Sequence, residues 1–450
     1  MTDRLVGEPG AAPAEFVVRG AVVIDRDGRR RADVAVRDGV VVAVGDELDG
    51  GTVLDASGCI LTPGLVDLNA GVGQPGHEET ETVRTAARAA ALGGFTTIVA
   101  RPDTDPVVDC AAVAKEVLLL GADAACRVLP AATVTVGAGG ERLVPMAELA
   151  ELGVRLFADD GVGIADGRLL RRALEYAAPL GVVIVQFAQD PSLAAGGHMN
   201  EGAWSSRLGI GGVPAEAEEV VVMRDLALAR LTGGRLHFRT LSTAASWAMV
   251  AGARRRGLPV SAEASIHHLL LTDEACSSFD PATKFRPPLR TTEDRAAIVA
   301  AVAAGDVDAL VSDHTPHSIE DKEVPFDEAA PGASSLQWLL AVALSELTLA
   351  DASEGGAGRT GPVGLAELIA ALSWRPRAIL TGMPDAGGRI EPGAVADLTV
   401  IDPTATWTLD PLAGASRTRT TPFAGRTLRG RVRHTIVGGV PVVLDAVAQR

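Results

Sequence analysis

The middle of the chain, from about residue 61 to 382, alternates short apolar runs with stretches rich in alanine and leucine. The stretch ETVRTAARAAALGG (81–94) has a helical pattern, ends in glycine and precedes the strand-like run FTTIVA (95–100). Strands that take turns with helices are joined by right-handed crossovers and form a parallel sheet. About eight such units fit a (β/α)8 TIM barrel better than a doubly wound sheet, and no GxGxxG motif opens the first crossover. We therefore predict the α/β class with a barrel at its centre.

Both ends of the chain have a different pattern from the middle. The segment ADVAVRDGVVVAVGD (32–46) alternates apolar and polar residues around an Asp-Gly pair, which is a hairpin signature. The segment VRHTIVGGVPVVLD (432–445) is again rich in strand residues and interrupted by a turn. We expect one small β-sandwich domain built from both termini. The predicted parts are residues 1–60 and 386–450 for this domain and residues 61–385 for the barrel.

Composition excludes several classes of protein. Hydrophobic residues make up 47% and charged residues 22%, which is ordinary for a soluble globular protein. The net charge of −16 argues against nucleic acid or an anionic membrane as a partner. No apolar run is long enough for a membrane span, no signal peptide pattern opens the chain, and the 4 cysteines form no CxxC pair. We expect a cytoplasmic protein with reduced thiols.

The chemistry of such a barrel sits at the carboxyl ends of its strands. The predicted strand ends carry DLNAGVG (67–73), RPDTDP (101–106), an Asp-Asp pair at 159–160 and SDHTPH (312–317). These ends are therefore the candidate site.

A resemblance to a known family covers nearly the whole chain. It is carried in order by LTPGLVDLNAGVGQPGHEETETVRTAARAAALGGFTTIVARPDTDPVVD, FADDGVG, MNEG, LST, HHLLLTDE, RPPLR, SDHTPH and RTTPFAGRTLRGRV. These motifs resemble the dihydroorotases, which are cyclic amidohydrolases of the amidohydrolase superfamily. The resemblance implies a metal-hydrolase barrel that holds zinc, a β domain from both termini, and interconversion of dihydroorotate and carbamoyl aspartate in pyrimidine synthesis.

The same resemblance indicates that most of the family's site is missing. The family's four histidine ligands fall on Asn69, Gly71, Phe187 and Thr240. Its substrate-contacting side chains fall on Gly73, Asp103 and Arg286. The bridging metal carboxylate matches at Asp160 and the catalytic aspartate at Asp313, with His314 and His317 beside it as pocket candidates. Catalytic zinc needs imidazole and carboxylate ligands, and two carboxylates alone do not hold it. We expect no cofactor, and Asp313 as a relic of the family's chemistry.

The remaining histidines have structural and functional interpretations. We expect Asp313 to hydrogen-bond neighbouring backbone or His267, and His267 and His268 to serve as a helix cap or core packing. His237 lies three residues before Thr240 and should face the opposite side of its strand. A rebuilt metal site from His77 and His198 together with Asp313 and His314 is the alternative. The Asp159 and Asp160 pair has a turn-capping interpretation as well.

An electrostatic expectation follows from the loss of zinc. Asp160 and Asp313 face one cavity without a metal cation, so they should repel each other and one should hold a proton near neutral pH. Arg286 should neutralise part of this charge.

Three functions remain open from the sequence. The first is a non-catalytic dihydroorotase homologue, and the resemblance makes aspartate transcarbamoylase a plausible partner and a homo- or hetero-oligomer the expected state. The second is an active dihydroorotase with an atypical site. The third is a metal-free barrel repurposed for another ligand around Asp160, Asp313, His314 and Arg286.

Overall fold

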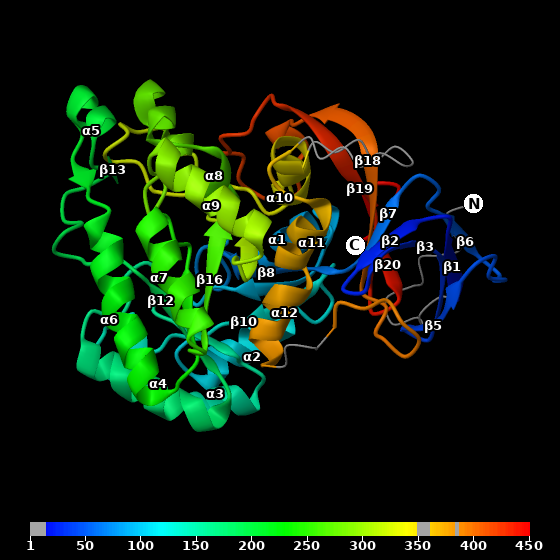
Figure 1. Ribbon diagram of the computed structural model, residues 1–450, viewed down its shortest axis with the longest axis horizontal. Helices are drawn as coiled ribbons and strands as arrows, with labels where there is room; N and C mark the ends of the chain where they lie inside the picture. Colours follow the sequence, from blue (N-terminus) through cyan, green and yellow to red (C-terminus); the bar gives the residue numbers. More distant parts are fainter. Residues whose placement is uncertain (1–14, 349–360, 383–386) are drawn as a thin grey trace.

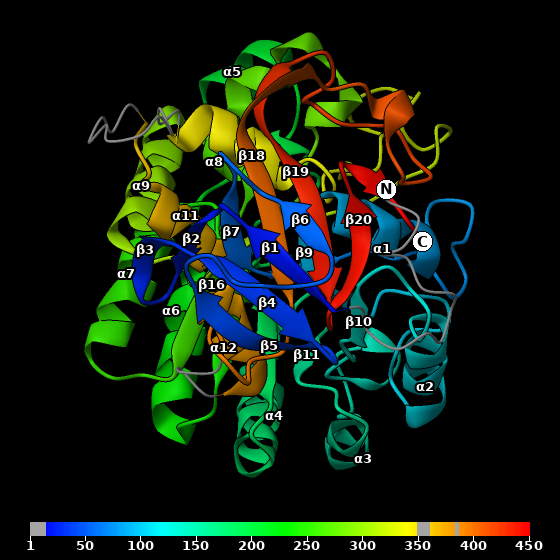
Figure 2. The ribbon, with the colours of Figure 1, turned by 90° about the vertical axis from the view of Figure 1, so that its right-hand side faces the viewer.

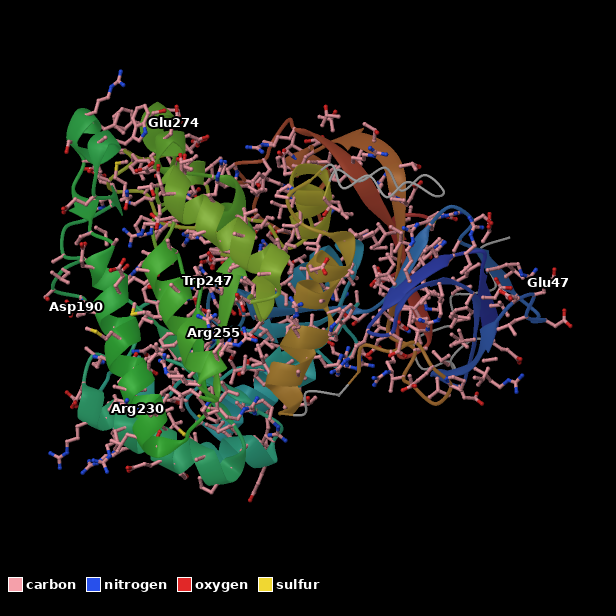
Figure 3. All side chains as sticks on the ribbon, viewed as in Figure 1. Glu47, Asp190, Arg230, Trp247, Arg255 and Glu274 are labelled. Atoms are coloured by element: carbon pink, nitrogen blue, oxygen red, sulfur yellow. The ribbon has the colours of Figure 1, made fainter. Side chains whose placement is uncertain are left out.

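The computed structural model describes residues 15–348, 361–382 and 387–450. A large body of strands and helices lies beside a smaller body that contains the first and the last strands of the described chain (Figure 1). Side chains fill the space between the elements; Trp247 is buried, whereas Glu47, Arg230, Arg255 and Glu274 are exposed at the surface (Figure 3). In the described ranges, no helix combines the length and apolar character that a membrane crossing requires.

Eight of the described strands form the two central parallel sheets of the large body. They are β8 (Leu65–Ala70), β9 (Phe95–Ala100), β10 (Arg127–Pro130), β11 (Leu156–Ala158), β12 (Val183–Phe187), β15 (Leu236–Arg239), β16 (Val260–Ser265) and β17 (Ala309–Val311). They pair in the orders β10-β9-β8 and β11-β12-β15-β16-β17. Isolated parallel bridges join Ala132 to Phe157 and Ala70 to His314, at the edges of the two sheets. This arrangement is of the TIM-barrel type, as the alternation in the sequence predicts.

Helices lie around these strands (Figure 1). They are α1 (Val83–Leu92), α2 (Ala111–Leu120), α3 (Met146–Glu151), α4 (Gly167–Leu180), α6 (Glu216–Thr232), α7 (Ala244–Arg255), α9 (Thr292–Ala304), α11 (Leu365–Leu372) and α12 (Trp374–Thr381). Shorter elements are β13 (Met199–Asn200), α5 (Ala203–Leu208), β14 (Gly212–Val213), α8 (Ile266–Leu270) and α10 (Leu339–Ala343). The start of α1 shows why the sequence forms a helix there: Thr82 and Thr85 cap it reciprocally, and its buried face is mostly alanine. Small side chains let this helix pack closely on the sheet.

The smaller body consists of two sheets. Their strands are β1 (Phe16–Arg19), β2 (Val22–Asp25), β3 (Gly28–Arg31), β4 (Asp33–Arg37), β5 (Val40–Gly45), β6 (Val53–Asp55), β7 (Ile60–Pro63), β18 (Leu398–Thr408), β19 (Thr427–Val437), β20 (Val440–Leu444) and β21 (Val447–Ala448). The sheet orders are β5-β4-β1-β6 and β21-β20-β19-β18-β7-β2-β3.

The two ends of the chain meet in the second of these sheets, where β7 pairs antiparallel with β18 (Figure 2). Phe16 and Val34 of one sheet share a buried apolar cluster with Leu61 and Ile436 of the other. The chain passes from this body to the barrel at Gly64, between β7 and β8. The β-rich termini therefore form an additional sheet domain.

Candidate functional site

A cavity of about 160 Å³ lies at the carboxyl ends of the barrel strands. Its lining residues are Asn69, Arg101, Asp103, Asp160, Gly161, Phe187, Arg239, Thr240, Phe285, Arg286, Asp313, Thr315, Pro331 and Gly332. The fold thus brings together most of the residues that the sequence indicates, because parallel strands end at the same edge of a sheet. Gly71, Gly73, His314 and His317 are not among the residues that line the cavity.

Arg239, at the end of β15, supplies a positive charge to this cavity. Its Nη1 atom donates a hydrogen bond to Oδ1 of Asp160, and its Nε atom lies 3.8 Å from Oε1 of Glu263. The Arg239 and Asp160 side chains are 5% and 6% exposed, and Glu263 is fully buried. The carboxylate that the resemblance assigns to a metal is therefore engaged by a guanidinium of the chain itself.

Asn69, at the end of β8, acts as a hydrogen-bond donor at the centre of the site. Its Nδ2 atom lies 3.0 Å from Oε1 of Glu263, 3.2 Å from Oδ1 of Asp313 and 3.3 Å from Oγ1 of Thr240. Its backbone N–H donates to Asp67 at 2.9 Å. The amide N–H groups thus point at the acids, whereas a metal ligand would offer a lone pair.

Asp313 is buried and has a left-handed backbone with φ of 50°. Burial raises its pKa to about 6; Arg101 opposes this rise, and Glu263 adds to it. The direction agrees with the expectation that an acid of this cavity holds a proton near neutral pH. The prediction that Asp313 hydrogen-bonds neighbouring backbone or His267 is wrong, because its carboxylate accepts a hydrogen bond from the side chain of Asn69.

His267 is held by aromatic rings. Its ring lies between those of Phe285 and Phe423, with centroids 4.1 Å and 5.6 Å away, and neither ring nitrogen has a hydrogen-bond partner among the described residues. Burial lowers its pKa well below the ordinary value, which favours the neutral ring. His268 is also buried and contacts Ser265 and the Pro287 carbonyl. The expectation of core packing is confirmed for both.

Arg101 occupies the space beside Gly71. Its Nη2 atom lies 2.9 Å from Oδ2 of Asp103, and its Nη1 atom donates to Thr315 at 2.8 Å. A Cβ atom on Gly71 would lie 2.9 Å from the carbonyl oxygen of His314 and 3.0 Å from Nη2 of Arg101. No imidazole fits at position 71 without movement of the backbone.

Gly73 has a different reason to be glycine. Its φ is 64°, and a Cβ atom there would lie 2.6 Å from the Glu81 carbonyl oxygen. The residue makes a tight turn and contributes no group to the cavity.

Arg286 lines the cavity but does not neutralise its acids as expected. Its guanidinium carbon lies 5.4 Å from the centre of the Phe187 ring. No ion pair joins it to Asp160 or Asp313 in the described structure. The neutralising role belongs to Arg239 and Arg101, because their side chains start from strand ends that face these acids.

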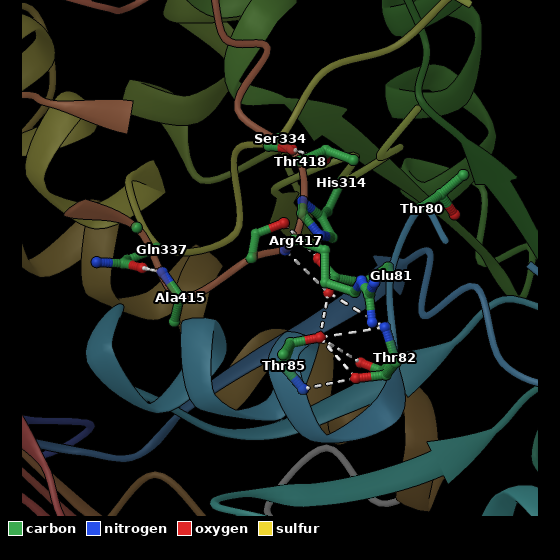
Figure 4. Close-up of polar contacts among 12 residues, drawn as sticks. Thr80, Glu81, Thr82, Thr85, His314, Ser334, Gln337, Ala415, Arg417 and Thr418 are labelled. Atoms are coloured by element: carbon green, nitrogen blue, oxygen red, sulfur yellow. Dashed lines mark hydrogen bonds and ion pairs between the residues drawn. The ribbon is translucent and has the colours of Figure 1, made fainter. Parts of the chain in front are cut away.

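His314 does not line the cavity, and its ring contacts Glu81 instead (Figure 4). Its Nε2 atom lies 3.2 Å from Oε2 of Glu81, and its Nδ1 atom accepts from the Ser335 N–H at 3.2 Å. Glu81 also accepts hydrogen bonds from Ser416 and Thr85. Burial opposes its ionisation, but His314 and these hydroxyls outweigh burial, so the pKa of Glu81 is lowered. This buried network links the barrel to the segment before β19.

The other histidines do not gather into a metal site. His317 contacts the Pro331 carbonyl at 2.9 Å, His77 lies 3.9 Å from Glu79, and His198 lies 3.5 Å from Lys284. Among the residues that the structure describes, no group of three or more His, Cys, Asp or Glu side chains is arranged to hold a metal ion.

His237 and Thr240 contact the same buried acid, contrary to the prediction that they face opposite sides. His237 Nε2 lies 3.0 Å from Oε2 of Glu263, and Thr240 Oγ1 lies 3.4 Å from Oε1. The alternation rule fails because Thr240 has a φ of 45°, which takes the chain out of strand geometry. The side chain of Asp159 accepts hydrogen bonds from the backbone N–H groups of Val134 and Thr135. It therefore stabilises the loop after β10 and does not cap its own turn.

Two charged residues of the site, Arg239 and Glu263, were not identified from the sequence, and Arg101 was included only as part of the strand end RPDTDP, without a role. Each is a charged residue within or directly after an apolar strand, and Arg239 immediately precedes a position of a missing histidine. A charge in such a place is costly to bury unless it is paired, so it indicates a partner inside the barrel. That signal was present in the sequence.

Comparisons with known proteins agree with this architecture. The family model described as Dihydro-orotase-like matches residues 58–246. A protein named dihydroorotase from Pelotomaculum thermopropionicum is 40% identical over 96% of this chain and 99% of its own length. One of the same name from Streptomyces coelicolor is 42% identical over 96% and 99%. The solved structure of an L-hydantoinase (dihydropyrimidinase) from Arthrobacter aurescens has a TM-score of 0.84 at 22% identity and covers 97% of each chain, which shows a common fold.

Proposed function

The chain belongs to the dihydroorotase-like family of the amidohydrolase superfamily, and on that premise we propose that it has a dihydroorotase-like role in pyrimidine synthesis without catalysing the reaction. In this proposal the barrel acts as a structural or regulatory partner of aspartate transcarbamoylase. The observation that carries the non-catalytic part is the hydrogen bond from Arg239 to the carboxylate of Asp160.

The zinc that the family implies does not fit the residues around the cavity. Asp160 already has a cationic partner, and a second cation beside it would be repelled by Arg239. Asn69 directs its N–H groups toward Asp313 and Glu263, and Phe187 offers no lone pair. The proposal therefore contains no water activated by a metal, and Asp313 has no such nucleophile to serve.

The non-catalytic role is tested by two measurements on one preparation of the chain, its metal content and its turnover of dihydroorotate and carbamoyl aspartate. We expect well under about 0.1 equivalent of zinc by mass spectrometry and no conversion of dihydroorotate or carbamoyl aspartate. The Streptomyces coelicolor relative, prepared in the same way, is the control for retention of metal during purification. Stoichiometric zinc together with turnover contradicts the proposal.

The partner is tested separately, because a protein without catalysis need not bind this enzyme. We expect the chain to shift the sedimentation of aspartate transcarbamoylase when the two are mixed at micromolar concentration. An unchanged sedimentation profile contradicts the partner and leaves the non-catalytic role standing.

A second candidate is an active dihydroorotase with an atypical site. It is favoured by the relatives of that name, which are 40% and 42% identical over nearly the whole chain. This candidate requires turnover that survives treatment with a chelator, since the cavity offers no set of zinc ligands among the described residues. The same assay with and without chelator separates the two candidates.

A further inference from the structure

A second cavity lies at the opposite end of the barrel from the candidate functional site. It has a volume of about 450 Å³ and includes the first residues of three strands, Val183 of β12, Leu236 of β15 and Val260 of β16. One side of α12 and Arg26, which follows β2 of the smaller body, also line it. Its volume lies in the range of about 300–1,000 Å³ that small-molecule sites have. The two cavities share no described residue, so this one is a separate place on the molecule.

Arginine side chains supply most of the charge in this cavity. Its described lining contains Arg26, Arg235, Arg254 and Arg375, against one carboxylate, that of Asp308. Asp308 forms an ion pair with Arg254, whose Nη2 atom lies 3.2 Å from its Oδ1 atom. Guanidinium groups in one partly buried space repel each other, and a single carboxylate does not balance four of them. The chain as a whole has a net charge of −16, so this positive excess is local and suits an anion from outside the protein.

Two of these arginines are held in place by main-chain oxygens. Arg235 donates from Nη1 to the Gly181 carbonyl at 3.1 Å and from Nη2 to the Ile379 carbonyl at 2.7 Å. Arg375 donates from Nη1 to the Val307 carbonyl at 3.3 Å. Neither arginine forms an ion pair with a carboxylate in the part of the chain that the structure describes, and burial lowers the pKa of both. Because a guanidinium has five N–H donors, these contacts leave donors on both groups for a ligand.

We propose that this cavity binds the diphosphate group of a small molecule, with Arg235 and Arg375 donating to its phosphate oxygens. The planar guanidinium matches the geometry of phosphate oxygens, and a diphosphate carries several negative charges where a carboxylate carries one. Trp374, which is half-buried, lines the same cavity, and an indole ring can stack on a base. Inorganic pyrophosphate and a nucleoside diphosphate are therefore the two sources of this chemistry. The site goes beyond the proposed function and does not depend on the metal content of the other cavity.

Calorimetric titration of the full chain tests the inference. The probes are inorganic pyrophosphate, ADP and sulfate, each at the same ionic strength and without divalent metal. We expect saturable binding of pyrophosphate at one site and binding of sulfate that is at least tenfold weaker. Tighter binding of ADP than of pyrophosphate assigns a nucleotide, and equal or weaker binding of ADP assigns the diphosphate group alone.

Substitution locates the site. Arg375→Gln should weaken pyrophosphate binding at least tenfold. Arg255→Gln is the matched control, because Arg255 is the last residue of α7, next to Arg254, but is exposed and does not line the cavity. It removes one positive charge from the same end of the barrel and should leave binding unchanged. No pyrophosphate binding at millimolar concentration, or equal binding by Arg375→Gln, overturns the inference, and sulfate binding as tight as that of pyrophosphate overturns the diphosphate assignment.

A measurement on the unsubstituted chain keeps the test decisive if Arg375→Gln does not fold. Phenylglyoxal modifies accessible arginines, and mass spectrometry of peptides reports each position. We expect pyrophosphate to protect Arg235 and Arg375 from modification and to leave Arg255 unprotected. Absence of protection at Arg235 and Arg375, or equal protection at Arg255, contradicts the site. Zinc content and turnover report on the proposed function alone, so the two can fail independently.

Discussion

The guanidinium of Arg239 donates a hydrogen bond to the carboxylate of Asp160, and both side chains are almost completely buried between the ends of β15 and β11. Glu263, on β16, lies on the other side of the same guanidinium and also contacts His237. One arginine thus joins acids from two strands at the point where the family's fold places its chemistry. Charges in such a network are stable only together, because each alone would be buried without a partner.

Removal of Arg239 should therefore destabilise the fold strongly. Arg239→Met leaves Asp160 and Glu263 without their cation, and we expect a loss of about 3–5 kcal/mol in the free energy of unfolding. Urea titration measures it. Arg230→Met, on the exposed face of α6, should change stability by no more than about 0.5 kcal/mol. Asp160→Asn in the Arg239→Met background should recover part of the lost stability. Equal effects of Arg239→Met and Arg230→Met would show that the buried pair contributes nothing to stability.

Asp313 should make stability depend on pH. Its pKa in the folded state is raised to about 6 from 3.8, so the fold favours the protonated carboxyl. The contribution of this carboxyl to the free energy of unfolding is complete below about pH 4 and is lost as the pH rises through about 6. This rise corresponds to at most about 3 kcal/mol. Asp313→Asn cannot ionise, so its stability relative to wild type should improve by up to that amount between pH 4 and 7.5. Asp49→Asn, at the surface, should follow the wild-type profile, and a parallel profile for Asp313→Asn would refute the prediction.

Glu81 should have the opposite pH dependence. Its pKa is lowered in the fold, so the fold favours the ionised carboxylate. The contribution of this carboxylate to the free energy of unfolding is present above about pH 4.5, the ordinary range of a glutamate pKa. It is lost as the pH falls through the pKa of the folded state. We expect Glu81→Gln to cost about 1.5–3 kcal/mol at pH 7, because hydrogen bonds to the charged carboxylate are weakened. Unfolding curves at pH 7 and 4 measure this, and the cost should shrink at pH 4. Glu274→Gln, at the surface, is the control, and a cost that grows on acidification would falsify the assignment.

Gly71 should tolerate no larger side chain. A Cβ atom would lie 2.9 Å from the His314 carbonyl oxygen, so Gly71→Ala forces the backbone of β8 or β17 to move, and we expect a cost of about 1–3 kcal/mol. Gly51→Ala is the control, since a Cβ atom there has no neighbour within 4 Å. Thermal unfolding of both variants provides the comparison. If Gly71→Ala unfolds at the same temperature as the wild type, position 71 has room for a larger side chain and the prediction is wrong.

Much of the architecture is predictable from local pattern. The strand β9 and the helix α1 before it follow from a run of β-branched residues and from an alanine-rich stretch closed by glycine. The terminal hairpins follow from alternation around Asp38-Gly39, where both residues have positive φ. Parallel strands end at one edge, so the sequence also indicates that Asn69, Asp160 and Asp313 meet.

The interior of the site is not predictable in the same way. Arg286 and Arg239 are both cations near the cavity, and only the packed structure decides that Arg239 reaches Asp160 while Arg286 lies over Phe187. The left-handed backbone of Thr240 likewise cannot be predicted from the alternation of side chains along a strand.

The amino-acid sequence by itself determined the order of strands and helices and the joining of its two β-rich ends, and its resemblance to the family showed that histidines are absent at the positions of the family's metal ligands. These depend on residue type and spacing along the chain. The tertiary structure alone decided which charges are partners, because pairing energy depends on distances of a few ångströms between residues far apart in sequence and on how far burial removes them from water.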